Sequence, residues 1–164
     1  MPLGDVIGSN WAWVIPAASA LSFFLVALLG RYLPNQGSFI SIIAITLGFV
    51  LFWYLLLDFL DTGASSFAVN WIIVGDTALT WGVLVDSLSV TMVGLVTFIA
   101  LIVQVYSLGY MKGDPRFGWY FASHSLFVAA MLALVLADNL LFLYIAWELV
   151  GLGSFLLIGY WREK

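Results

Sequence analysis

Residues 139–161 read NLLFLYIAWELVGLGSFLLIGYW and carry one acid, Glu148, near the middle of the stretch. A bilayer core about 30 Å thick requires roughly 20 apolar residues in a helix that rises 1.5 Å per residue. An ionisable side chain at that depth costs at least ~2.5–3.5 kcal/mol on insertion scales, and it usually faces a bundle interior or a water-filled path. We therefore expect a membrane-spanning helix with Glu148 facing the inside of a bundle and serving a function there.

The composition is that of an integral membrane protein. Of the 164 residues, 64% are hydrophobic and 9% are charged, whereas soluble domains have about 25% charged residues. The few charges form no basic face, which argues against nucleic acid as a partner. The sequence has no cysteine, so it excludes cysteine-ligated iron–sulfur clusters and disulfides and argues against a redox centre held by this chain. The N-terminus lacks a basic region and a small-residue cleavage site, so we expect no removable signal peptide.

The apolar segments predict an all-α membrane protein, with five transmembrane helices in a single membrane domain. A β-rich segment precedes Gly75-Asp76, a two-residue turn signal, and a second such segment follows it. We expect a small hairpin there, outside the membrane and lying on its surface, between the second and third helices. The expected spans are residues 11–29, 38–60, 85–108, 119–137 and 139–161, and the hairpin is residues 67–81.

The basic residues provide a check on the number of spans. Arg31 follows the first span, Lys112 and Arg116 follow the third, and Arg162 and Lys164 follow the fifth. With alternating sides, all five basic residues lie on one face of the membrane. The positive-inside rule makes that face cytoplasmic, which places the N-terminus and the hairpin outside.

Glu148 is the first candidate for chemistry. Because burial raises the pKa of a carboxylate and a nearby cation lowers it again, a buried glutamate can hold a proton whose release a partner controls. The alternative is a glutamate whose hydrogen bonds only fix helix packing. The small residues Gly151, Gly153 and Ser154 on the same helix would let another helix approach closely.

His124 and Asp86 are weaker candidates. His124, the only histidine, lies fourteen residues before Asp138, while Glu148 lies ten after it, a difference in depth of roughly 6 Å in antiparallel helices. It is a candidate proton relay towards the cytoplasm, or equally a neutral histidine bonded to a neighbouring helix. Asp86 fits a helix cap better than a relay. Gln104, with two threonines on the same helix (Thr91 and Thr97), is a weak signal of a wet interior, and no metal-binding spacing, phosphate loop or nucleophile–base pair is present.

Three segments resemble a known family: DSLS at 86–89, YSLGYM at 106–111, and WELVG at 147–151 with SFLLIG at 154–159. They look like the N-terminal part of the antiporter-like membrane subunit of complex I, called L in bacteria and chain 5 in mitochondria. The resemblance extends from about Trp71 onward, and Gly153 and Phe155 stand where the family often has Cys and Tyr.

The resemblance implies a role for two residues. Glu148 corresponds to the glutamate of the fifth helix, which in the family pairs with a lysine on a later helix and takes part in proton pumping. Asp86 corresponds to the acidic position before the third helix. Family members have well over a dozen helices, so we expect this chain to be a fragment of a longer subunit or to receive partner charges from another chain.

The resemblance also implies a setting: a subunit of a proton-translocating NADH-quinone oxidoreductase in a bacterial inner membrane, not functional alone. Flavin, iron–sulfur clusters and quinone are then expected in partner subunits, and the partners are other membrane subunits and the lipid bilayer. The alternatives are a multisubunit Na⁺/H⁺ antiporter, a related membrane hydrogenase or plastoquinone-reducing complex, and a structural membrane scaffold.

Overall fold

The computed structural model describes residues 11–74 and 77–161. It contains five helices that are long and apolar enough to span a membrane, together with a two-stranded antiparallel sheet. The predicted fold class is thereby confirmed. The elements are α1 (Val14–Leu29), α2 (Ser38–Thr62), β1 (Ser65–Val74), β2 (Thr77–Val85), α3 (Ser87–Tyr110), α4 (Phe117–Val135) and α5 (Leu140–Ile158).

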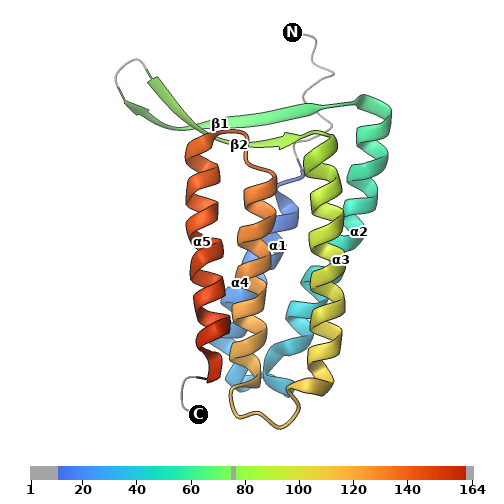
Figure 1. Ribbon diagram of the computed structural model, residues 1–164, viewed down its shortest axis with the longest axis vertical. Helices are drawn as coiled ribbons and strands as arrows, with labels where there is room; N and C mark the ends of the chain where they lie inside the picture. Colours follow the sequence, from blue (N-terminus) through green and yellow to red (C-terminus); the bar gives the residue numbers. More distant parts are fainter. Residues whose placement is uncertain (1–10, 75–76, 162–164) are drawn as a thin grey trace.

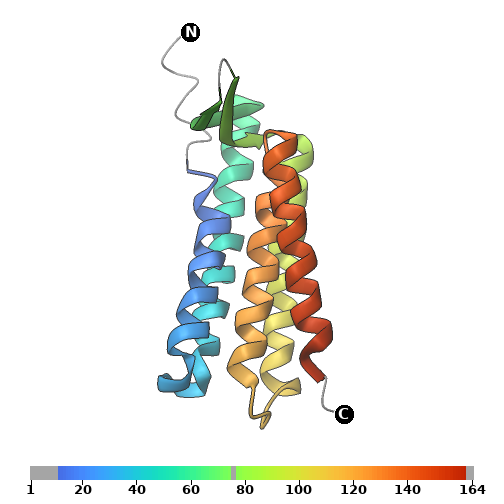
Figure 2. The same ribbon diagram turned by 90° about the vertical axis from the view of Figure 1, so that its left-hand side faces the viewer.

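The helices form two layers, with the hairpin lying across one end of the bundle. Figure 1 shows α5, α4 and α3 side by side in the nearer layer, and Figure 2 shows α1 and α2 together in the other. Helix α4 packs against α1, α5, α3 and α2. It is therefore the central helix of the bundle, and it is also the most buried of the five.

Glycine permits a close contact between the two layers at Gly94 of α3. A Cβ atom there would lie 2.6 Å from the Phe52 ring of α2, so the ring lies against the α3 backbone. At Gly48 of α2 a Cβ would lie 3.5 Å from Ile15 of α1, which is an ordinary contact distance. The buried side chains around them form one hydrophobic core that includes Leu132 of α4.

The hairpin is longer than the predicted 67–81. Its register pairs Ser65 with Val85 at the open end and is interrupted by an irregularity between Asn70 and Ile72. Val85 therefore belongs to the sheet, and the third helix begins at Ser87 rather than at the predicted residue 85. The predicted turn at Gly75-Asp76 lies outside the described residues.

The hairpin is fixed to the connection between α4 and α5. The backbone N–H of Leu84 donates to the carbonyl of Leu136 at 2.9 Å, and Val83 forms an isolated bridge with Ala137. Trp81 packs on Phe142 of α5 with ring centroids 4.2 Å apart. Through these contacts the strands cover the end of the bundle.

At the opposite end, α1 and α2 are joined by a tight reversal. Asn35 and Gln36 both adopt left-handed backbone conformations, with φ of 49° and 50°, and Gly37 follows with φ of 77°. The Gln36 side chain accepts a hydrogen bond from the Gly118 N–H at 2.6 Å and donates to the Pro115 carbonyl at 3.4 Å. Gln36 therefore joins the α1–α2 reversal to the loop that precedes α4.

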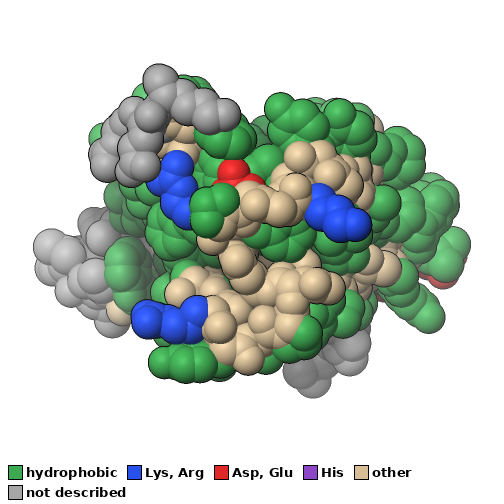
Figure 3. Space-filling model, turned by 90° about the horizontal axis from the view of Figure 1, so that it is seen from below, with side chains coloured by type: hydrophobic (Ala, Val, Ile, Leu, Met, Phe, Trp, Pro, Cys, Tyr) green, Lys and Arg blue, Asp and Glu red, His purple; other side chains and the backbone are tan. Residues whose placement is uncertain are grey.

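The described basic residues all lie at this second end. Arg31 follows α1, and Lys112 and Arg116 lie between α3 and α4; Figure 3 shows the described Lys and Arg side chains (blue) from this side. The separation of basic residues from the hairpin agrees with the predicted topology for these three, while Arg162 and Lys164 lie outside the described residues. Which face is cytoplasmic remains a prediction.

Candidate proton-transfer site

Glu148 lies near the middle of α5, which begins at a well-formed cap. The Asn139 side chain accepts a hydrogen bond from the Phe142 N–H at 2.9 Å and so satisfies one of the free donors at the helix N-terminus. No Gly or Pro interrupts the helix before Glu148, and Gly151 and Gly153 follow it without breaking the helix. The acid is therefore held at mid-helix, as its position in the apolar stretch predicts.

The expectation that Glu148 faces the interior of this bundle is wrong for the described chain. The side chain is exposed on the surface of α5. The buried residues of that helix are Phe142, Ala146 and Gly153, and Gly153 lies against Phe127 of α4, where a Cβ would come within 3.0 Å. Since Glu148 is two residues beyond Ala146, or about 200° around the helix, it points away from α4.

The face that carries Glu148 is rich in aromatic residues. Tyr144 and Glu148 lie one turn apart on this face, and both are exposed. Trp147 and Phe155 are 58% and 69% exposed, and nothing lies within 4 Å of where a Gly151 Cβ would be. Of the predicted small residues, Gly153 provides close helix contact and Gly151 leaves open space beside the acid.

His124 is buried in the bundle on α4 and faces α3. Its Nδ1 lies 3.2 Å from Nε2 of Gln104, which is fully buried. Among the described residues, no hydrogen bond or ring contact joins His124 to Glu148. The structure therefore separates the two residues that the sequence combined into one candidate path.

Asp86 forms the N-terminal cap of α3. It accepts a hydrogen bond from the Ser89 N–H at 2.7 Å, and its own N–H donates to the Ser89 hydroxyl at 2.8 Å. The hydrogen bond from the Ser89 backbone holds the pKa of the Asp86 carboxyl below its usual value. The cap interpretation is confirmed by this capping box.

Several polar residues around His124 were not recognised from the sequence. The Ser107 hydroxyl lies 2.9 Å from the Tyr120 hydroxyl, and the Tyr160 hydroxyl donates to Asp114 at 2.5 Å. Tyr120 lies one turn before His124 on α4, and Ser107 lies one turn after Gln104 on α3. From this one-turn spacing, the two pairs of residues could have been placed on facing helix surfaces. Of the two threonines, Thr97 is buried but bonded to its own helix, and Thr91 is exposed.

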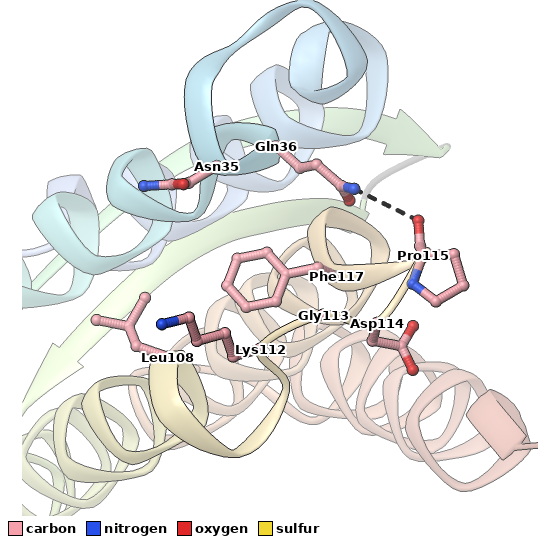
Figure 4. A pocket seen from close by; sticks show the side chains of 8 residues that line it. All are labelled: Asn35, Gln36, Leu108, Lys112, Gly113, Asp114, Pro115 and Phe117. Atoms are coloured by element: carbon pink, nitrogen blue, oxygen red, sulfur yellow. Dashed lines mark hydrogen bonds between the residues drawn. The ribbon is translucent and has the colours of Figure 1, made fainter.

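The basic end carries an open pocket of about 710 Å³ between the α1–α2 reversal and the α3–α4 loop. Figure 4 shows the Lys112 amine on one side of this pocket and the hydrogen bond from Gln36 to Pro115 on the other. Asp114 also lines it. Among residues 11–74 and 77–161, no group of three His, Asp or Glu side chains is placed to hold a metal ion.

Comparison with known proteins gives consistent matches. The family described as NADH-ubiquinone oxidoreductase (complex I), chain 5 N-terminus, matches residues 71–121. The chain is 40% identical over 157 residues to the F₄₂₀H₂ dehydrogenase subunit L of Methanosarcina mazei, covering 94% of this chain and 23% of that protein. It is 37% identical over 161 residues to the chloroplast NAD(P)H-quinone oxidoreductase subunit 5 of Anthoceros angustus, covering 93% and 22%.

A bacterial relative gives the same result. The NADH-quinone oxidoreductase subunit L of Escherichia coli is 34% identical over 145 residues, covering 86% of this chain and 24% of that protein. The chain thus spans about a quarter of the length of the curated relatives that it matches. The resemblance predicted from the three motifs is confirmed: over most of its length the chain is similar to the N-terminal part of the antiporter-like membrane subunit L, or chain 5, of complex I-type oxidoreductases.

Proposed function

We propose that this chain is part of a proton-translocating membrane subunit of an NADH:quinone oxidoreductase, in which quinone reduction drives proton transfer through Glu148. The observation that carries the proposal is the position of Glu148: a single carboxylate at mid-helix in α5, on an exposed face. Acids inside membrane-spanning helices are rare and usually mark ion or proton pathways.

The exposed face of α5 supports a role in which Glu148 meets a partner. A carboxylate left in lipid would be costly, and an opposite charge within ~4–6 Å would favour its charged form. The open space at Gly151 and the aromatic surface formed by Tyr144, Trp147 and Phe155 provide room for a further helix. In the proposal, that helix brings a cation whose approach and withdrawal control proton binding at Glu148.

The relatives support an oxidoreductase complex as the setting. Their names specify NADH, NAD(P)H or F₄₂₀H₂ with quinone or dehydrogenase activity. We propose that other membrane subunits are the partners, that flavin, iron–sulfur clusters and quinone are bound by other subunits, and that the complex lies in a bacterial inner membrane with the hairpin on the outer face. Labelling of Lys112→Cys from each side of sealed vesicles would test that orientation.

The test is Glu148→Gln in the whole complex, because glutamine keeps the volume of the side chain and removes its proton-binding site. We expect proton transfer per electron to fall while assembly is retained. Gly109→Ala in α3 is the control, since it lies away from the face of α5 that carries Glu148 and, among the described residues, nothing lies within 4 Å of its Cβ position. Unchanged proton transfer and turnover in Glu148→Gln would contradict the proposal.

The alternative functions give different results in the same preparation. Sodium-dependent proton exchange without NADH oxidation would identify a multisubunit antiporter. A structural scaffold would tolerate Glu148→Ala with full coupling. Copurification with flavin and iron–sulfur subunits is the result expected for the proposed complex.

A further inference from the structure

The His124–Gln104 pair has a defined hydrogen-bond direction. An amide nitrogen only donates hydrogen bonds, so Nε2 of Gln104, 3.2 Å from Nδ1 of His124, requires that Nδ1 accept. The ring proton of a neutral His124 is then on Nε2. His124 is 7% exposed and Gln104 is fully buried, so the pair lies inside the bundle.

The other end of the Gln104 amide has no partner. Its Oε1 atom is buried without a hydrogen bond, and so are the hydroxyls of Ser123 and Ser125 on either side of His124. A buried polar atom without a partner costs about 1–3 kcal/mol. Of these three atoms, Gln104 Oε1 belongs to the amide that contacts His124, and it can accept a hydrogen bond.

A half-turn of the Gln104 amide would present its oxygen to a charged histidine. When His124 gains a proton, both ring nitrogens become donors, and Nδ1–H needs an acceptor. Exchanging Oε1 for Nε2 provides that acceptor without moving the backbone of either helix. Gln104 can therefore form a hydrogen bond with His124 in both protonation states of the histidine. An apolar side chain at position 104 could not.

Aromatic and hydroxyl side chains lie between the pair and the basic end. Tyr120, one turn from His124, has its ring centroid 6.2 Å from the imidazole and its hydroxyl 2.9 Å from the Ser107 hydroxyl. Tyr160 packs edge-on against Tyr120, with centroids 5.9 Å apart, and donates to Asp114 in the α3–α4 loop. These residues reach the end of the bundle that carries Lys112 and Arg116.

Within residues 11–74 and 77–161, no buried charged side chain lies beside His124. From α1 and α2, which also pack on α4, the buried polar side chains are hydroxyls, those of Ser19, Ser22, Ser38 and Ser41. Towards the basic end the ionisable groups are Tyr120 and Tyr160, followed at the end itself by Lys112, Asp114 and Arg116. Glu148 points away from α4. Among the described residues, His124 is the one buried side chain that can become positively charged.

We propose that His124 and Gln104 form a buried proton-binding site, loaded from the basic end of the bundle along Tyr120 and Ser107 and separate from Glu148. The Gln104 amide turns over when the proton arrives, and its oxygen accepts a hydrogen bond from Nδ1–H of the imidazolium. The proposal does not depend on Glu148, since it rests on the contact between α3 and α4.

The single histidine makes a direct test possible. The full chain, with ¹⁵N-labelled histidine and a tag that contains no histidine, is placed in phospholipid nanodiscs and its two ring nitrogens are followed by NMR from about pH 8 to about pH 4, which brackets the unperturbed value near 6.5. We expect a neutral Nε2–H ring at the upper end and a doubly protonated ring at the lower end. A ring that stays neutral throughout would overturn the proposal.

Two variants and one control identify the residues involved. Gln104→Met, similar in length but without the amide, should lower the proton affinity of His124 about tenfold, since it removes a hydrogen bond to a charged group. Thr97→Val is the control on the same helix, because that hydroxyl bonds to its own helix at 2.7 Å; it should leave the titration unchanged. An equal shift in both variants would overturn the role of Gln104.

Tyr120→Phe tests the route. It removes the hydroxyl that contacts Ser107 and should slow exchange of the ring proton with water while leaving the titration midpoint in place. Unchanged exchange would overturn entry from the basic end. Glu148→Gln should change neither quantity, so failure of this proposal and failure of the proposed function are distinguishable.

Discussion

The carboxylate of Asp138 occupies the space that a Cβ atom at Gly82 would need, so any side chain at position 82 would overlap it. Gly82 pairs with Ala68 across the hairpin, and a Cβ there would also lie 2.8 Å from the Ala68 Cβ. The hairpin can therefore lie against the α4–α5 connection only because position 82 has no side chain.

Gly82→Ala should lower the stability of the folded chain by about 1–3 kcal/mol, the usual cost of adding a methyl group where there is no space. Thermal unfolding in one detergent, followed by circular dichroism, measures the loss. Gly109→Ala in α3 is the control, because nothing lies within 4 Å of its Cβ position and alanine favours a helix. Equal unfolding temperatures for the two variants would show that the overlap does not matter.

Asn139 has two functions that substitutions can separate. Its oxygen caps α5, and its Nδ2 donates to the Thr80 carbonyl of β2 at 3.0 Å. Asn139→Ala should cost about 2 kcal/mol because both bonds are lost, and Asn139→Ser about 1 kcal/mol because serine also caps helices but is too short to reach Thr80. Chemical denaturation of both variants tests this order; a serine variant as unstable as the alanine variant would contradict it.

Gln36 should be more sensitive to substitution than its neighbour Asn35, although both have left-handed backbone conformations. Gln36→Ala removes the acceptor of the Gly118 N–H and should destabilise the chain by about 1–3 kcal/mol. Asn35→Gly should be neutral or stabilising, since glycine adopts φ of 49° without strain. The reverse order in a thermal unfolding experiment would show that backbone strain outweighs the hydrogen bond.

Asp86 should make stability depend on pH in the acidic range. Because its pKa is lowered in the folded chain, its contribution is fully present above the unfolded value near ~3.9 and is lost as the pH falls through the folded value. Asp86→Ala should cost about 1 kcal/mol at neutral pH. Asp86→Asn, which caps without titrating, should lose this pH dependence; a slope equal to that of the natural chain would assign the effect to another acid.

The membrane helices and the hairpin could be predicted because the relevant signals are local. Each span is an apolar stretch about as long as a bilayer is thick, and the hairpin has β-forming residues on both sides of a turn signal. The start of the third helix was misplaced by two residues because Val85 is as apolar as a helix residue, although it pairs with Ser65 in the sheet.

The surroundings of the candidate residues could not be predicted in the same way. Helices α4 and α5 are apolar on nearly all sides, so their sequences do not indicate which side faces a neighbour. The exposure of Glu148 and the contact between His124 and Gln104 both depend on how each helix is rotated about its axis. That rotation is set by close contacts such as Gly153 against Phe127, which involve residues far apart in the sequence.

Helix α5 is anchored at both of its ends and packs on α4 between them. Asn139 joins one end to the hairpin, and Arg116 donates to the Tyr160 carbonyl at the other at 2.6 Å. These anchors resist a shift of α5 along its axis. A helix that binds the exposed face of α5 would therefore meet Glu148 at a fixed height relative to His124.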